Sequence, residues 1–146
     1  MTRSVLTIGY EGRSPEALMT ELRNREVQVL LDVRLRPNSR KPGFSKTSLR
    51  EACEAGGIQY VHDKRLGTPP EMMDHVKSGA GYDWETSEQY RVFLRTQTEA
   101  LEKAVDIVTH NVTCLLCFER QPADCHRRIV AEELSVRAGV RVDHVE

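Results

Sequence analysis

The sequence has no long hydrophobic run and almost no net charge. Its 146 residues carry 21 Lys plus Arg against 22 Asp plus Glu, a formal net charge of −1, and the mean hydropathy is −0.50. These values exclude a membrane-spanning protein, a disordered acidic chain and a protein that binds nucleic acid through bulk positive charge. An apolar content of 39% suffices for one hydrophobic core and not for two, so we expect a single domain over residues 1–146.

Cysteines and aromatic residues are also few. The four cysteines, Cys53, Cys114, Cys117 and Cys125, are too few and too unevenly spaced for the disulfide framework of a small secreted protein, so we expect reduced thiols. No apolar segment long enough for a signal peptide follows the N-terminus, and the expected location is the cytoplasm. Three Phe and four Tyr argue against an aromatic surface that stacks single-stranded nucleic acid.

Familiar signature motifs are missing as well. The chain contains no GxGxxG, GxxxxGK(S/T), HExxH or GxSxG motif. Dinucleotide-binding, P-loop, zinc-protease and α/β-hydrolase functions therefore lack support. On this basis we predict no cofactor.

What the sequence does contain is a regular alternation of strand-like and helix-like segments. Short β-rich runs predict strands at 4–10, 27–33, 58–62, 112–118 and 140–145, and the segments between them predict helices at 14–25, 46–55, 87–109 and 125–138. This alternation favours a three-layer α/β domain with a mostly parallel sheet of about five strands flanked by helices. Thr86 and Gln89 have capping-box spacing at the start of the third helix. The stretch 63–86 fits no period, and we interpret it as a functional lid or a mobile loop.

Reactive and charged side chains cluster where the predicted strands end. Tyr10 ends the first strand, Asp32 and Arg34 lie at the end of the second, and Cys117 and Glu119 lie at the end of the fourth. Ligands bind at the carboxyl ends of parallel strands, where loops and helix N-termini converge, so we expect these side chains to share one site. Tyr10 offers a hydroxyl donor there. Asp32 is a candidate for acid–base chemistry or for orienting a neighbouring guanidinium.

A cationic segment follows the second strand. Between residues 33 and 50 lie six cations and no acid: Arg34, Arg36, Arg40, Lys41, Lys46 and Arg50. At the end of a strand, such a segment places a positively charged wall beside the site. We predict that Arg34, Arg36 and Pro37 contribute to binding an anionic substrate. The alternative is an ordinary solvated loop.

The start of the last predicted helix combines a thiol, an imidazole and guanidinium groups. We expect Asp124 to cap this helix. Cys125, His126 and Arg127 then occupy its first turn, where the helix dipole stabilises a thiolate and lowers its pKa. The guanidinium of Arg127 then lies at the unfavourable end of the helix dipole, which costs ~0.3–1 kcal/mol. We therefore expect a negative group beside it: Glu119, the thiolate of Cys125 or a bound anion. The alternative is a structural cysteine next to a surface histidine.

Cys114 and Cys117 have the spacing of a metal-binding or redox pair, but both lie within a predicted strand. Side chains alternate between the two faces along a strand, so the two sulfurs point in opposite directions and cannot share a metal ion. We therefore predict no metal at this pair. Cys114 is expected in the core, and Cys117 within reach of the site.

These motifs together resemble the domain of unknown function 488 family, in order along nearly the whole chain. The resemblance rests on Glu119 followed by Cys125-His126-Arg127, on Leu31-Asp32-Val33-Arg34, and on the shorter motifs Thr7-Ile8-Gly9-Tyr10, Pro37, Ser39, Arg40, Pro42, Phe44, Gly57-Ile58-x-Tyr60 and Leu66-Gly67. It implies a compact α/β domain of bacterial and archaeal cytoplasm with these residues at one site, and it supplies no reaction. A looser similarity links Asp32-Val33-Arg34 and Cys117 to rhodanese and Cdc25-type phosphatase domains.

Three functional hypotheses remain open. In the first, a small enzyme acts on a phosphorylated or nucleotide-like anion held by Arg34, Arg36 and Arg127. Cys125 or Cys117 is its nucleophile or redox centre. Glu119, Asp32 and His126 are its acid–base candidates. In the second, a non-catalytic module binds a nucleotide or a nucleic-acid backbone with salt-dependent affinity. In the third, Cys117, Glu119, Cys125 and His126 bind a metal ion, although their spacing matches no zinc knuckle. The sequence leaves the oligomeric state open.

Overall fold

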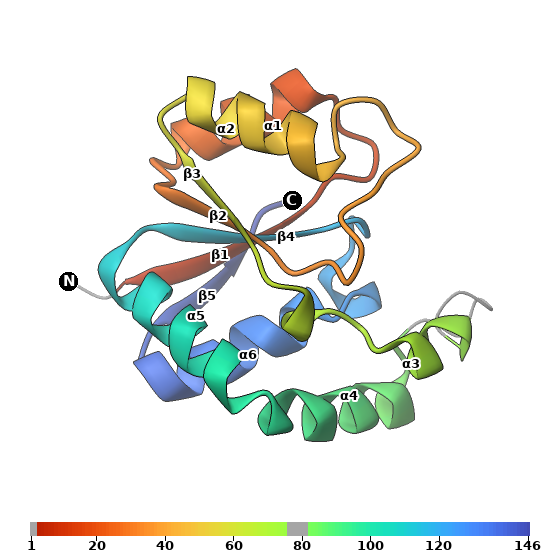
Figure 1. Ribbon diagram of the computed structural model, residues 1–146. Coiled ribbons are helices and arrows are strands. Elements are labelled where there is room, and N and C mark those ends of the chain that lie inside the picture. The colour runs from red at the N-terminus through yellow and green to blue at the C-terminus, as the bar shows by residue number, and fades with distance from the viewer. Residues whose placement is uncertain (1–2, 76–81) are drawn as a thin grey trace.

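A five-stranded parallel sheet forms the centre of the molecule (Figure 1). The computed structural model describes residues 3–75 and 82–146. The strands are β1 (Ser4–Gly9), β2 (Val29–Asp32), β3 (Gln59–His62), β4 (Thr113–Cys117) and β5 (Arg141–His144), in the order β3-β2-β4-β1-β5. Every neighbouring pair in this sheet is parallel. The α/β prediction is confirmed, and the sheet is wholly rather than mostly parallel.

Helices cover both faces of the sheet (Figure 1). One face carries α1 (Pro15–Asn24) and α2 (Lys46–Ala55), and the other carries α4 (Trp84–Thr96), α5 (Thr98–His110) and α6 (Arg127–Ala138). The connections contain the short helix α3 (Pro70–His75) and the 3-10 turns η1 (Lys64–Leu66) and η3 (Pro122–Asp124). Among the helices in the described parts of the chain, none is both long enough and apolar enough to cross a membrane.

The sheet divides the hydrophobic core into two layers. Leu31 and Leu115 pack in the layer that includes α4, α5 and α6, and Leu30 packs in the layer with α1 and α2. Full burial of each such leucine contributes ~1.5–3 kcal/mol. Cys117 belongs to the first layer and Cys114 to the second. The predicted alternation along β4 is therefore confirmed, and these two sulfurs lie on opposite faces.

The predicted helix over 87–109 is two helices in the structure. α4 and α5 meet at Gln97, whose ψ of 58° lies outside the helical range. The carboxylate of Asp83 caps α4 by accepting a hydrogen bond from Thr86 N, so the predicted capping box of Thr86 and Gln89 is wrong. The break lets both helices contact α6. That tertiary contact has no counterpart in the local sequence.

The last helix begins later than predicted. α6 begins at Arg127, with His126 as its N-cap residue. Asp124 ends η3 instead of capping α6, and Cys125 is extended, with φ −135° and ψ 144°. Pro122 explains the shift, because its fixed φ suits the first position of a separate short turn. Cys125 therefore lies beside the N-terminus of α6 and not within its first turn.

The stretch 63–86 is less irregular than predicted. It contains η1, α3 and the start of α4. A Cβ added to Gly67 would lie 2.5 Å from the backbone of Leu35, so this connection packs closely on the loop between β2 and α2. The lid interpretation depends on residues 76–81, which lie outside the described residues.

Candidate functional site

A cavity of about 460 Å³ opens beside the carboxyl ends of β1, β2 and β4. Its lining includes the predicted site residues Tyr10, Arg34, Arg36, Cys117, Glu119 and His126. The predicted residues outside its lining are Asp32, Pro37, Cys125 and Arg127. The carboxyl ends of these strands thus border one cavity, and the structure separates predicted residues that line it from predicted residues that lie behind the lining.

Asp32 is fully buried at the end of β2 and is surrounded by hydrogen-bond donors. Its carboxylate accepts from Arg34 Nε at 2.9 Å and from Arg34 Nη2 at 2.7 Å, which forms a bidentate ion pair. The backbone N–H of Arg34 and the hydroxyl of Tyr60 donate to the same carboxylate. Burial, followed by the charge of Asp32, raises the pKa of Tyr60, so the phenol stays a donor. Asp32 is therefore a positioning residue for Arg34.

Arg34 borders the cavity, but its guanidinium is largely used within the protein. Nη1 donates to the carbonyl oxygen of Phe44 at 2.8 Å and to the hydroxyl of Tyr10 at 3.3 Å. The rings of Tyr10 and Phe44 stack with centroids 4.5 Å apart. Burial acts to lower the pKa of Arg34, but the hydrogen bonds and charge of Asp32 leave it raised. Arg34 thus ties the loop between β2 and α2 to the end of β1.

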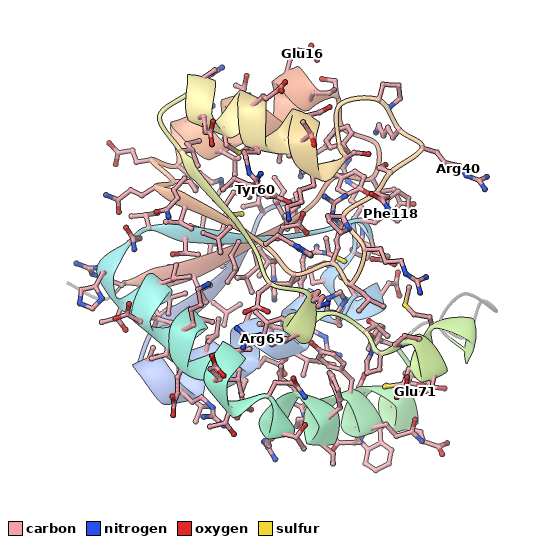
Figure 2. The ribbon with its side chains drawn as sticks, viewed as in Figure 1. Glu16, Arg40, Tyr60, Arg65, Glu71 and Phe118 are labelled. Carbon is pink, nitrogen blue, oxygen red and sulfur yellow. The ribbon has the colours of Figure 1, made fainter. Side chains whose placement is uncertain are left out.

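Arg36 and Arg40 are different, because nothing in the described part of the chain engages their guanidinium groups; we call them the free arginines. Both residues are exposed, both line the cavity, and neither has a hydrogen-bond or ion-pair partner among the described residues. Arg40 projects from the outer end of the loop between β2 and α2 (Figure 2). Lys41 is already engaged, since its Nζ donates to the carbonyl oxygen of Tyr10 at 3.4 Å. The side chains of Arg36 and Arg40 are therefore exposed at the border of the cavity.

Two thiols and an imidazole meet beside the cavity. His126 is buried, and its Nε2 donates to the carbonyl oxygen of Val33 at 2.7 Å. A carbonyl only accepts, so Nε2 carries the proton and Nδ1 of the neutral ring offers a lone pair. Nδ1 lies 3.8 Å from both Cys117 Sγ and Cys125 Sγ. We name these three side chains the sulfur–imidazole cluster; Cys117 Sγ also donates to Glu119 Oε2 at 3.5 Å.

Burial and mutual contact shift the protonation of these groups. Burial acts to raise the pKa of Cys125, but the hydrogen bond from Cys117 and the charge of His126 bring it well below the usual value. The same hydrogen bond, followed by burial, raises the pKa of Cys117. Burial acts to lower the pKa of His126, but the charge of Cys125, together with the hydrogen bonds to Cys125 and Val33, leaves it raised. Burial, followed by the charge of Cys125, raises the pKa of Glu119 to about 7.

The predicted thiolate character of Cys125 therefore has a different main cause from the one expected. Neighbouring side chains, and not the helix dipole alone, favour the charged sulfur. The N-terminus of α6 does contribute a donor, because the backbone N–H of Arg127 points at Cys125 Sγ over 3.5 Å. Cys125 is completely buried, whereas Cys117 is 5% exposed and reaches the cavity. A ligand in the cavity would thus contact Cys117 before Cys125.

Arg127 and Pro37 support the site from outside the cavity lining. The guanidinium of Arg127 is fully buried and donates to the carbonyl oxygens of Glu119 and Arg120. These carbonyls are the negative partner that its position beside the start of a helix requires. The carbonyl oxygen of Pro37 accepts from Lys46 N at 2.8 Å, where α2 begins. Both residues hold loops in place.

Eight further lining residues were not among the predicted site residues: Leu35, Asn38, Ser39, Arg40, Thr68, Met73, Tyr82 and Phe118. Tyr82 hydrogen-bonds with Thr68, and its ring centroid lies 6.2 Å from that of His126. Arg40 belongs to the cationic segment, and Phe118 directly follows the fourth strand. Their positions next to these motifs could have predicted that they line the cavity. Tyr82 lies in an aperiodic stretch, where the sequence offers no such signal.

The fold and the cavity define a parallel α/β protein, covered on both faces, with a cavity at the carboxyl edge of the sheet. The family model described as Domain of unknown function DUF488 matches residues 14–134 of the 146-residue chain. The chain belongs to this family. No curated protein and no solved structure is detectably similar to it. The family description assigns no activity, so the function is argued from the site itself.

Proposed function

We propose that the protein is a small enzyme that acts on an anionic substrate of the phosphorylated or nucleotide type. The observation that carries the proposal is a juxtaposition: the free cations Arg36 and Arg40 line the same cavity as Cys117, Glu119 and His126. Guanidinium groups bind phosphate oxygens through paired hydrogen bonds. Thiol, carboxyl and imidazole groups carry most nucleophilic and acid–base chemistry. The cavity volume of about 460 Å³ suits a small molecule.

Each group of the lining has a role in this proposal. The two free arginines bind the anionic part of the substrate. Tyr10 accepts a hydrogen bond from Arg34, which leaves its own phenol proton available to the substrate. Cys117, Glu119 and His126 face the reacting atom, where they supply a nucleophile and a proton donor or acceptor.

The placement of the reactive groups favours an enzyme over a nucleic-acid-binding module. Cys117 is 5% exposed, so an atom that reacts there must enter the cavity, which a duplex backbone cannot do. The net charge of −1 provides no broad attraction for a polyanion. A binding module would need the free arginines and would have no use for a thiol, a carboxyl group and an imidazole behind them.

Turnover of a panel of phosphomonoesters, phosphodiesters and nucleotides, followed by phosphorus NMR, tests this proposal. We expect a substrate whose kcat falls by ~10²-fold or more in Glu119→Gln, the size of effect that acid–base groups provide. The KM for the same substrate should rise in Arg36→Ala. Arg23→Ala removes an exposed arginine at the end of α1, far from the cavity lining, and should leave both constants unchanged.

Two results would contradict the proposal. Nucleotide binding without turnover, lost in Arg36→Ala and weakened steeply by salt, would identify the binding module instead. Equal turnover in the wild type, Cys117→Ser and Glu119→Gln would remove these side chains from the chemistry.

A further inference from the structure

We propose that Cys117, Cys125 and His126 bind one Zn²⁺ ion, with a fourth coordination position directed toward the cavity. The inference deepens the proposed function by naming the cofactor of the same site, and it rests on that function only for what the ion does. With the ion bound, Cys117 and His126 act as its ligands, and Glu119 remains the acid–base group of the cavity. The binding of the ion itself is argued from the donor atoms. These are two sulfurs and one imidazole nitrogen, all buried and all within 4.8 Å of one another.

The spacing of the donor atoms is close to that of a tetrahedral zinc site. Zn–S bonds of about 2.3 Å and Zn–N bonds of about 2.0–2.1 Å at a tetrahedral angle place a sulfur and a nitrogen about 3.6 Å apart. In the structure, Nδ1 of His126 lies 3.8 Å from Cys117 Sγ and 3.8 Å from Cys125 Sγ. Small side-chain rotations would therefore bring all three atoms into coordination distance.

In its neutral form, the imidazole takes the tautomer that a metal requires. Nε2 of His126 donates to the carbonyl oxygen of Val33, so Nδ1 directs its lone pair toward the two sulfurs. Metal-binding histidines usually donate their second ring N–H to a carbonyl or carboxylate in this way, which fixes the orientation of the ring. Val33 follows β2 directly, and its carbonyl is thereby held by the sheet.

The chemistry of the donors selects the ion. Two sulfurs and an imidazole suit Zn²⁺, whereas Mg²⁺ and Ca²⁺ prefer oxygen ligands. Two thiolates balance the charge of the ion, which removes the cost of burying an isolated charge. The backbone N–H of Arg127 donates to Cys125 Sγ and would continue to do so with the sulfur bound to metal.

The fourth position faces the cavity because two of the three ligands border it. Cys117 and His126 line the cavity, and Cys125 lies behind them. Glu119 also lines the cavity, with Oε2 3.5 Å from Cys117 Sγ, but its oxygens are not part of the compact donor set. Three protein ligands, an open position and a nearby carboxylate are the pattern of catalytic zinc sites. Zinc would there activate water or polarise a phosphoryl oxygen.

The three proposed ligands do not have the sequence spacing of known zinc-binding motifs, and the structure explains why they still meet. Cys117 ends β4, and η3 followed by the extended Cys125 returns the chain to the same point before α6 begins. The CxxC pair formed with Cys114 is excluded, because that sulfur lies on the other face of the sheet. The ligands are brought together by the β4–α6 connection and not by a short knuckle.

The experiment uses the full chain, purified under reducing conditions without a histidine tag. Metal content is measured by mass spectrometry, and metal-free protein is titrated with Zn²⁺ and, separately, with Co²⁺. We expect one equivalent of zinc per chain. Cobalt should give a sulfur-to-metal charge-transfer band and the intense visible bands of tetrahedral coordination. These readouts require no substrate.

Variants assign the ligands. Cys117→Ala, Cys125→Ala and His126→Ala should each weaken zinc binding by more than ~100-fold, beyond the loss that follows removal of an outer-shell partner. Cys114→Ala changes another buried cysteine of β4 and should keep the full equivalent, as should Glu119→Gln. Circular dichroism reports whether each variant is folded. The cobalt spectrum of the wild type stays decisive if a ligand variant unfolds.

The inference is overturned if metal-free protein takes up no zinc from an excess, or if its cobalt spectrum lacks the sulfur band. It is also overturned if Cys114→Ala and Cys117→Ala lose zinc equally, which would indicate adventitious binding. A protein that binds zinc but turns over no phosphorylated substrate would keep this inference and contradict the proposed function. Turnover by a protein that binds no zinc would do the reverse.

Discussion

Two buried polar clusters stand at the ends of the neighbouring strands β2 and β4, and they differ in how completely their atoms are satisfied. Around Asp32, Arg34 and Tyr60, the contacts are short and the buried polar atoms have partners inside the protein. In the sulfur–imidazole cluster, Cys117 and His126 are 3.8 Å apart and border a cavity. The first cluster is complete as it stands, whereas the second has bonding capacity left for a ligand.

The comparison shows why charge at a strand end does not by itself identify a functional residue. From the sequence, Asp32 is a candidate acid and Arg34 a candidate anion-binding cation, but in the structure the two side chains form an ion pair with each other. Arg36, two positions later, is exposed and has no partner among the described residues. We therefore expect substitutions in the first cluster to change stability most, and substitutions in the second to change ligand binding most.

The largest effect on stability should come from Asp32→Asn. It leaves the buried Arg34 without its counter-charge, and breaking a buried ion pair in this way costs ~3–5 kcal/mol. Urea unfolding measures the loss. Asp63→Asn is the matched control, because Asp63 binds Arg65 through the same pattern at the end of β3, but with the arginine 36% exposed. Its cost should be far smaller. Equal losses in the two variants would contradict the distinction between a scaffold pair and a surface pair.

A smaller loss is expected from Arg127→Met, which keeps much of the side-chain volume and removes the donors to Glu119 and Arg120. Leaving buried carbonyls unpaired costs ~1–3 kcal/mol. Arg128→Met is the neighbouring control, because that guanidinium makes an i,i+4 pair with a partly exposed glutamate and should matter little. If urea unfolding finds the two variants equally stable, Arg127 does not hold the β4–α6 connection.

The smallest effect is a pH dependence at Asp63. Burial acts to raise the pKa of this carboxyl, but the hydrogen bonds and charge of Arg65 leave it below its ordinary value of 3.8. At pH values between the folded pKa and 3.8, the unfolded chain therefore binds more protons than the folded chain. The pair stabilises the protein above pH 3.8, and this contribution is lost as the pH falls through the folded pKa. The stability difference between wild type and Asp63→Asn should shrink from about pH 6 to about pH 2. A constant difference would show that the ion pair contributes nothing.

Local sequence patterns were sufficient for the sheet and for the edge on which the site lies. Apolar runs and helix punctuation predict all five strands, and the residues at their carboxyl ends include Tyr10, Cys117 and Glu119, which do line the cavity. The strand order was not predictable, because a parallel crossover does not specify which neighbour it joins. The break at Gln97 was also missed, because α4 and α5 both contact α6, an element distant in sequence that a local pattern does not report.

Local sequence patterns also could not predict which charged side chains have partners within the protein. Arg34 is engaged because the carbonyl of Phe44 and the hydroxyl of Tyr10 happen to lie beside it in the fold. Arg127 is engaged because the chain after β4 turns its carbonyls inward. Such partners are distant or irregular in sequence, so the same residue type can be a scaffold at one position and a ligand-binding group at another.

If the sulfur–imidazole cluster and the free arginines share one ligand cavity, a ligand bound by the arginines must shield the thiols, and thiol labelling of metal-free protein measures this. Iodoacetamide should modify Cys117 first, because it lines the cavity and is hydrogen-bonded to Cys125, whose low pKa gives this pair one anionic sulfur. Cys53 and Cys114 lie outside the lining, and burial raises their pKa values to about 11 and about 12. Pyrophosphate should slow the labelling of Cys117 in the wild type and not in the double variant Arg36→Ala, Arg40→Ala. Labelling of Cys53 or Cys114 as fast as Cys117, or a rate that pyrophosphate leaves unchanged, would contradict the shared cavity.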